Sequence, residues 1–213
     1  MQSLAEKHRP TTLDGVVGQG VAVKRLRAIA RRGVAGRSFW ISGASGTGKT
    51  TIARILAGEI ASPCAIQELD AGDLTTDRIR EIDKRLTMYA IGKGGKAYII
   101  NEAHGLRKGQ VRQLLSLIED MPEHVLFAFT TTNDGQESLF EDNIDAGPLL
   151  SRCVRVKLTN QGLAKAFAEH VRSIAVSEGL DGKPLASYIA LAKREHNNCR
   201  AMLWEVETGS MAG

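Results

Sequence analysis

The sequence lacks most features of secreted, zinc-stabilised or membrane-spanning proteins. Its 213 residues include three cysteines that form no Cys-x-x-Cys pair, which argues against a zinc site or a disulfide framework. No uncharged apolar run approaches the ~18 residues of a membrane helix, and the charged N-terminus lacks the apolar stretch of a signal peptide. We therefore expect an intracellular protein in a reducing compartment, either cytoplasmic and nucleoid-associated or nuclear, with no membrane partner.

The composition fits a globular chain with a slight excess of positive charge. Hydrophobic residues make up 43% and charged residues 24%, which excludes disordered and fibrous proteins. The length predicts one domain with a small appendage. The net charge of +4 is a mild bias toward polyanions and does not by itself identify a partner.

Short apolar runs alternate with amphipathic stretches, which predicts an α/β fold with a five-stranded parallel sheet flanked by helices. The runs have polar or turn residues at their ends, so we expect strands buried on both faces. They cover residues 39–42, 65–70, 97–101, 125–131 and 154–158. The helical patterns between them cover residues 20–32, 48–61, 75–89 and 108–119.

Only helical patterns follow the last strand, at 161–177, 184–196 and 198–208, and they predict a small helical lid domain. The expected division is an α/β nucleotide-binding domain over 1–157, a lid over 158–209 and an unstructured tail over 210–213.

The strongest motif is GASGTGKT at 43–50, which matches the phosphate-binding pattern G-x-x-x-x-G-K-[ST] between a predicted strand and helix. The glycines let backbone N–H groups face phosphate oxygens, and Lys49 adds a positive charge at the β and γ phosphates. The Thr50 hydroxyl would bind Mg²⁺, so ATP or ADP with Mg²⁺ is the expected cofactor. The motif and its neighbour contribute the cofactor-binding residues Gly43, Ser45, Gly46, Thr47, Gly48, Lys49, Thr50 and Thr51.

Catalysis of phosphoryl transfer also needs acidic or polar groups at the end of a neighbouring strand. Glu102 ends the segment KAYIINE and could orient an attacking water, although it could also simply cap the next helix. The residue before it is Asn101, an amide that would hold a metal only weakly, through water. We therefore expect weakened handling of Mg²⁺.

Several segments together resemble the AAA+ ATPases, and specifically the small subunits of replication clamp loaders, as in replication factor C and its bacterial and phage counterparts. They are EKHRPTTLDGVVGQ at 6–19, IQELDAGDLTTDRIREI at 66–82, TTTND at 130–134 and PLLSRC at 148–153. The resemblance spans roughly residues 4–209. It implies that Arg9, Pro10, Val17 and Gly18 lie in the segment that borders the adenine.

The resemblance also assigns three further residues to catalysis. Asn133 matches the sensor-1 position, which orients water or the γ-phosphate. Arg152 matches an arginine finger that acts in trans on a neighbouring subunit, although from chemistry alone a surface arginine is the commoner case. Arg200 in HNNCRAML matches the sensor-2 position facing the chain's own γ-phosphate, with Asn197 or Asn198 as the helix N-cap.

Basic residues at two helix starts match the DNA-facing segments of clamp loaders, which hold a duplex through phosphate contacts. No aromatic stacking platform accompanies these residues, so they could also be ordinary solvated helix faces. They are Arg78, Arg80, Arg107, Lys108 and Arg112.

The expected function is therefore that of an ATP-hydrolysing subunit that joins others in a ring or spiral and loads a sliding clamp onto primer–template DNA. A nucleotide-binding scaffold subunit with weak hydrolysis, or another AAA+ DNA motor such as a Holliday-junction helicase, are the alternatives. Loader subunits ordinarily continue into a collar domain, which is absent from this sequence. The chain is thus either a piece of a longer subunit or a protein without a collar.

Overall fold

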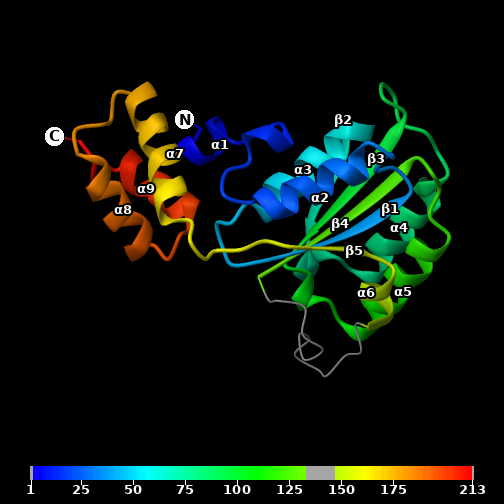
Figure 1. Cartoon of the computed structure of the whole chain (residues 1–213). Coiled ribbons are helices and arrows are strands. Elements are labelled where there is room, and N and C mark those ends of the chain that lie inside the picture. The colour runs from blue at the N-terminus through cyan, green and yellow to red at the C-terminus, as the bar shows by residue number, and fades with distance from the viewer. Residues whose placement is uncertain (1, 133–146, 213) are drawn as a thin grey trace.

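The computed structural model describes residues 2–132 and 147–212, which form an α/β domain and a helical lid (Figure 1). An N-terminal helix, α1 (Leu4–Lys7), comes first. The helices of the α/β domain are α2 (Gly20–Ala30), α3 (Lys49–Ile60), α4 (Thr76–Leu86), α5 (Lys108–Glu119) and α6 (Gly147–Ser151). Its strands are β1 (Arg37–Ser42), β2 (Ala61–Asp70), β3 (Gly95–Asn101), β4 (Val125–Thr131) and β5 (Val154–Lys157). The lid contains α7 (Ala164–Ser177), α8 (Leu185–Arg194) and α9 (Cys199–Glu207).

The sheet confirms the predicted fold class. Its five described strands lie in the order β2-β3-β4-β1-β5, and all the pairings are parallel. The carboxyl ends of the strands therefore meet at one edge, where α/β proteins bind their ligands. The phosphate loop follows β1 at this edge, and Asn101 ends β3 beside it.

Alternate side chains of the central strands supply two separate cores, as the twofold period of a strand requires. Trp40, Tyr98 and Phe127 face α4, α5 and α6, while Phe39 and Ile99 face α2 and α3. Because both faces of the sheet are covered, the sequences of the central strands are continuous apolar runs. The two cores thus cover both faces of the sheet whose strand ends carry the site.

The two outer strands differ from the expectation of burial on both faces. β2 and β5 form the edges of the sheet, and most of their residues are half-buried or exposed. β2 also begins at Ala61, directly after α3, with an irregular register before Ile66. Polar side chains near the end of β2 consequently remain available to the site.

The lid has its own apolar core, in which Phe167, Tyr188 and Met202 are buried. Leu4 of α1 joins this core, so the N-terminal helix packs on the lid although it precedes the α/β domain. The tail was expected to be unstructured, but the structure differs at Met211. This residue is buried, and its carbonyl accepts a hydrogen bond from the Gly182 amide (2.9 Å). No helix within residues 2–132 and 147–212 is long and apolar enough to cross a membrane.

Candidate nucleotide site

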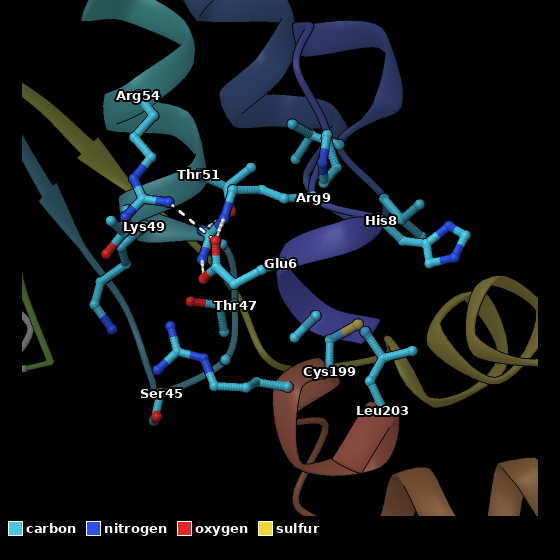
Figure 2. A pocket seen from close by; sticks show the side chains of 18 of the residues that line it. Glu6, His8, Arg9, Ser45, Thr47, Lys49, Thr51, Arg54, Cys199 and Leu203 are labelled. Carbon is cyan, nitrogen blue, oxygen red and sulfur yellow. Dashed lines mark hydrogen bonds and ion pairs between the residues drawn. The ribbon is translucent and has the colours of Figure 1, made fainter. Parts of the chain in front are cut away.

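A pocket of about 490 Å³ lies where the phosphate loop, the strand ends and the lid meet. This volume falls in the range typical of small-molecule sites. Figure 2 shows the pocket with the N-terminal segment on one side and Cys199 and Leu203 of α9 on another. Ten predicted cofactor-binding residues line it: Arg9, Pro10, Val17, Ser45, Gly46, Thr47, Gly48, Lys49, Thr50 and Thr51.

The phosphate loop has the backbone that its glycines permit. Gly46 and Gly48 have φ values of +74° and +98°, in the left-handed region that favours glycine. Gly46 also lies against the lid, because a Cβ atom placed on it would be 1.9 Å from Oδ1 of Asn198. Asn198 is the N-cap of α9 and accepts a hydrogen bond from the Ala201 amide (3.2 Å), which confirms one of the two caps expected for this helix.

Lys49 is buried at the start of α3 and curls back onto the loop. Its Nζ donates hydrogen bonds to the carbonyl oxygens of Gly43 (2.9 Å) and Ala44 (3.0 Å). Burial lowers the pKa of Lys49, the carboxylate of Glu102 opposes this, and the charge of Arg200 lowers the pKa further. A buried cation, Lys49, and an exposed one, Arg200, thus lie close enough to repel each other, and a polyphosphate is an anion that would stabilise both.

Two predicted residues contribute without lining the pocket. Gly43 supplies a carbonyl to Lys49, as described above. Gly18, with φ of +79°, packs against the lid, since a Cβ atom there would be 2.8 Å from Cδ2 of Leu163. Both glycines therefore shape the site from outside the cavity.

Side chains from three strands and a helix meet at the end of the pocket beside Thr50. The carbonyl oxygen Oδ1 of Asn101 accepts hydrogen bonds from the hydroxyls of Thr50 (3.2 Å) and Thr130 (2.8 Å). The amide Nδ2 of Asn101 donates to Oε1 of Glu68 on β2 (2.7 Å). The described residues contain no group of three or more His, Cys, Asp or Glu that could hold a metal by themselves.

These residues fit a nucleotide-bound Mg²⁺. Such an ion keeps several waters and takes most of its protein contacts from one or two oxygen groups, with phosphate oxygens completing the shell. The Thr50 hydroxyl can ligate the ion while it donates its proton to Asn101, and Lys49 lies one residue before it.

Glu102 has a backbone conformation that non-glycine residues rarely adopt, with φ of +50° directly after β3. Such backbone strain costs roughly 1–3 kcal/mol and concentrates at functional sites. Its side chain lines the pocket, and Oε2 accepts a hydrogen bond from the Thr132 hydroxyl (3.4 Å). Arg200, in the first turn of α9, lines the same pocket from the lid.

A chain of ion pairs on the N-terminal side was not predicted. Arg9 donates to the Thr51 hydroxyl (2.9 Å) and to Glu6 (3.0 Å), and Arg54 pairs with both Glu6 (3.2 Å) and Glu68 (2.7 Å) (Figure 2). Arg54 lies four residues after Thr50 on α3, so helical spacing could have placed it on the same face. Glu68 carried no such local signal.

One predicted catalytic residue, Arg152, does not line this pocket. Arg152 follows α6 and lies on the other side of the sheet, where its guanidinium pairs with Glu119 at the end of α5 and donates to the Pro148 carbonyl (3.0 Å). Asn133 lies outside the described residues.

The basic residues predicted to contact DNA lie at the starts of α4 and α5. Gln110 of α5 donates to the carbonyl of Leu74, just before α4, so the two helix starts are neighbours. Arg78 is paired with Glu81 and Arg80 with Asp77 (2.8 Å). Arg107, Lys108 and Arg112 are exposed at the start of α5.

The fold and the phosphate site define the class of protein. Residues 39–157, more than half of the chain, match the family model "ATPase family associated with various cellular activities (AAA)", and the chain belongs to this family. Membership implies ATP binding.

Curated relatives place the chain more closely, among proteins related to the gamma and tau clamp-loader subunits of DNA polymerase III. It is 33% identical to DNA polymerase III subunit tau of Escherichia coli K12 over 180 residues, 74% of this chain and 27% of that protein. It is 29% identical to the subunit gamma of Buchnera aphidicola from Acyrthosiphon pisum, over 84% of this chain and 54% of that protein. The chain thus spans about half or less of these relatives.

A solved structure, that of the Holliday junction branch migration motor RuvB of Thermotoga maritima, has a similar fold. The TM-score is 0.70 at 26% identity, with 93% of this chain and 64% of that chain covered. The similarity includes the α/β domain and the lid, given this coverage.

Proposed function

We propose that this chain is an ATP-binding and ATP-hydrolysing subunit of a clamp-loader-type complex, which places a sliding clamp on primer–template DNA. The observation that carries the proposal is the position of Arg152. One chain assembles the phosphate loop, Glu102 and Arg200 around a single pocket, while Arg152 is held at a different face. A finger placed there can complete only the site of a neighbouring subunit in a ring or spiral.

The roles of the residues follow from their places. Loop N–H groups and Lys49 hold the phosphates, and Glu102 orients the attacking water. Thr50 would hold Mg²⁺ directly and Asn101 would hold it weakly, through water, and the bound ion would neutralise charge on the β and γ phosphates. Arg200 from the lid and Arg152 from the neighbour stabilise the transferred phosphoryl group, and Asn133 orients water or the γ-phosphate.

DNA contacts are assigned to the paired helix starts of α4 and α5. Phosphate contacts do not depend on sequence, and exposed cations beside helix N-termini suit them. Arg107, Lys108 and Arg112 are exposed, and so is Arg80, but Arg78 and Arg80 would first have to exchange acidic partners for phosphates.

The experiment is reconstitution with the companion subunits and clamp of the source organism. We expect hydrolysis to rise when the clamp and primed DNA are both present, and clamp to be retained on primed circular DNA. Lys49→Ala should abolish both readouts. The variant should remain folded without nucleotide, because the substitution removes a positive charge whose burial is unfavourable.

Two other results would point to other functions. Nucleotide binding with no turnover in the complete assembly would favour the scaffold subunit, for which the amide of Asn101 is the supporting observation. Stimulation by a four-way junction without any clamp would favour a branch-migration motor, for which the similarity to RuvB is the supporting observation.

A further inference from the structure

The amide of Asn101 has two ends with different partners, and this difference gives Glu68 a role. Oδ1 accepts from the hydroxyls of Thr50 and Thr130, and Nδ2 donates to Glu68 at 2.7 Å. We propose that Glu68 is the positioning residue that fixes the direction of the Asn101 amide and so adapts the site to Mg²⁺ without a carboxylate at position 101. This inference rests on the proposed nucleotide-dependent function.

Glu68 decides the direction because it is the partner that cannot change its role. A hydroxyl can donate or accept a hydrogen bond, so Thr50 and Thr130 would tolerate either orientation of the amide. An ionised carboxylate can only accept, and therefore it requires the NH₂ end of Asn101. With Nδ2 bound to Glu68, the carbonyl oxygen must face Thr50.

The direction matters for the hydroxyl that would ligate the metal. When Oδ1 faces Thr50, the hydroxyl donates its proton and keeps lone pairs available for a cation. In the reversed orientation the amide would donate to Thr50 instead, occupying a lone pair and turning N–H groups toward the cation. Glu68 thus acts on the proposed metal position through Asn101.

The carboxylate of Glu68 is itself held in place. Arg54 donates from Nε to Oε2 of Glu68 (2.7 Å) and also pairs with Glu6 of the N-terminal segment (3.2 Å). Figure 2 shows Arg54 and Glu6 pointing toward one another beside Thr51. Because Arg54 balances the charge of Glu68, the contribution of Glu68 is orientation and not an extra negative charge.

The test compares ATP affinity in Mg²⁺ with ATP affinity in EDTA, by calorimetry on the whole chain. We expect the wild type to bind more tightly in Mg²⁺. Glu68→Gln should reduce this ratio on the order of 10-fold, as is typical when a residue that orients a metal ligand is removed. A glutamine can donate or accept and so releases the amide. The unchanged affinity in EDTA and an unchanged melting temperature would show that the variant is folded.

Exchange of the two groups provides the rescue. Asn101→Asp combined with Glu68→Gln keeps one carboxylate and one amide in contact, with the hydrogen bond reversed, and should restore the Mg²⁺ ratio. Asn101→Asp alone brings two carboxylates to a separation of about one hydrogen bond. Its ratio of ATP affinity in Mg²⁺ to that in EDTA should therefore be lower than that of the exchanged pair. Asp70→Asn is the matched control, since it removes a carboxylate from the same strand and pocket but leaves the partner of Asn101 in place.

The outcomes separate this inference from the proposed function. A wild-type Mg²⁺ ratio that survives in Glu68→Gln, or that falls equally in Asp70→Asn, would overturn the positioning role while nucleotide binding stands. Failure of the exchanged pair to exceed either single variant would also overturn it. Failure of the wild type to bind ATP at all would instead contradict the proposed function, and the inference with it.

Discussion

The two ends of the nucleotide pocket are built in different ways. The phosphate cradle comes from one contiguous stretch, 43–51, in which loop and helix start follow each other along the chain. The other end brings together residues from α3, β2, β3 and β4. In our proposal this end holds the metal and the reacting groups, and an arginine from a second chain completes it. The first is therefore determined locally, and the second depends on strand order and assembly.

The largest effect should come from the group supplied by the neighbour. Arg152→Ala should lower hydrolysis in the complete assembly by ~10³–10⁵, the range for systems that depend on an arginine finger. Mixing Arg152→Ala subunits with Lys49→Ala subunits should restore some activity, because some junctions then pair an intact Arg152 with an intact Lys49. The measurement is turnover against mixing ratio, with co-assembly followed by light scattering.

This experiment can contradict the proposal that Arg152 completes the site of a neighbouring subunit. If the two variants co-assemble and no activity returns at any ratio, Arg152 acts within its own chain or is structural. Glu119→Gln is a useful companion variant, since it frees Arg152 from its ion pair without removing the guanidinium. It should retain activity in the assembly.

The contrast between the two ends also explains what the sequence could predict. Strand and helix positions followed from local periodicity, and the strand 125–131 and the helix 108–119 were predicted at their observed limits. Glu68 was not predicted as part of the site, because its contact with Asn101 depends on β2 lying beside β3 with Glu68 opposite Ile99. Likewise, composition could not show that β2 and β5 are edge strands, since exposure at an edge depends on strand order.

A smaller effect should distinguish the contact between the phosphate loop and the lid from loop geometry itself. Gly46→Ala and Gly48→Ala both place a side chain at positive φ, but only the first meets another residue, with Asn198 at 1.9 Å and nothing within 4 Å of the second. We expect both to destabilise the fold. Gly46→Ala should cost about 1–3 kcal/mol more, the usual range for overpacking.

Thermal unfolding of the two variants in the absence of nucleotide measures this difference. Because the strain of positive φ is common to both, the difference reports the lid contact. Equal melting temperatures would mean that the lid moves away from the loop without cost, and that the cradle is independent of the lid as well as local in sequence.

The smallest effect should be a dependence on pH in the lid wall of the pocket. Burial, with a minor contribution from the charge of His8, lowers the pKa of His170 from its ordinary value of 6.5. The unfolded chain therefore binds a proton more readily than the folded chain in the window just below pH 6.5. Stability is thus fully present above that pH and decreases as the pH falls through the window.

The measurement is the melting temperature at pH 7.5 and pH 5.5 for the wild type and for His170→Gln, which keeps a polar side chain but does not titrate. We expect the variant to lose less stability on acidification than the wild type. The Glu178 carboxylate, whose pKa is lowered by its hydrogen bonds to Lys7 and His8, acts at lower pH, below its ordinary value of 4.5. Identical pH dependence in both proteins would show that His170 does not contribute to the change in stability between pH 7.5 and pH 5.5.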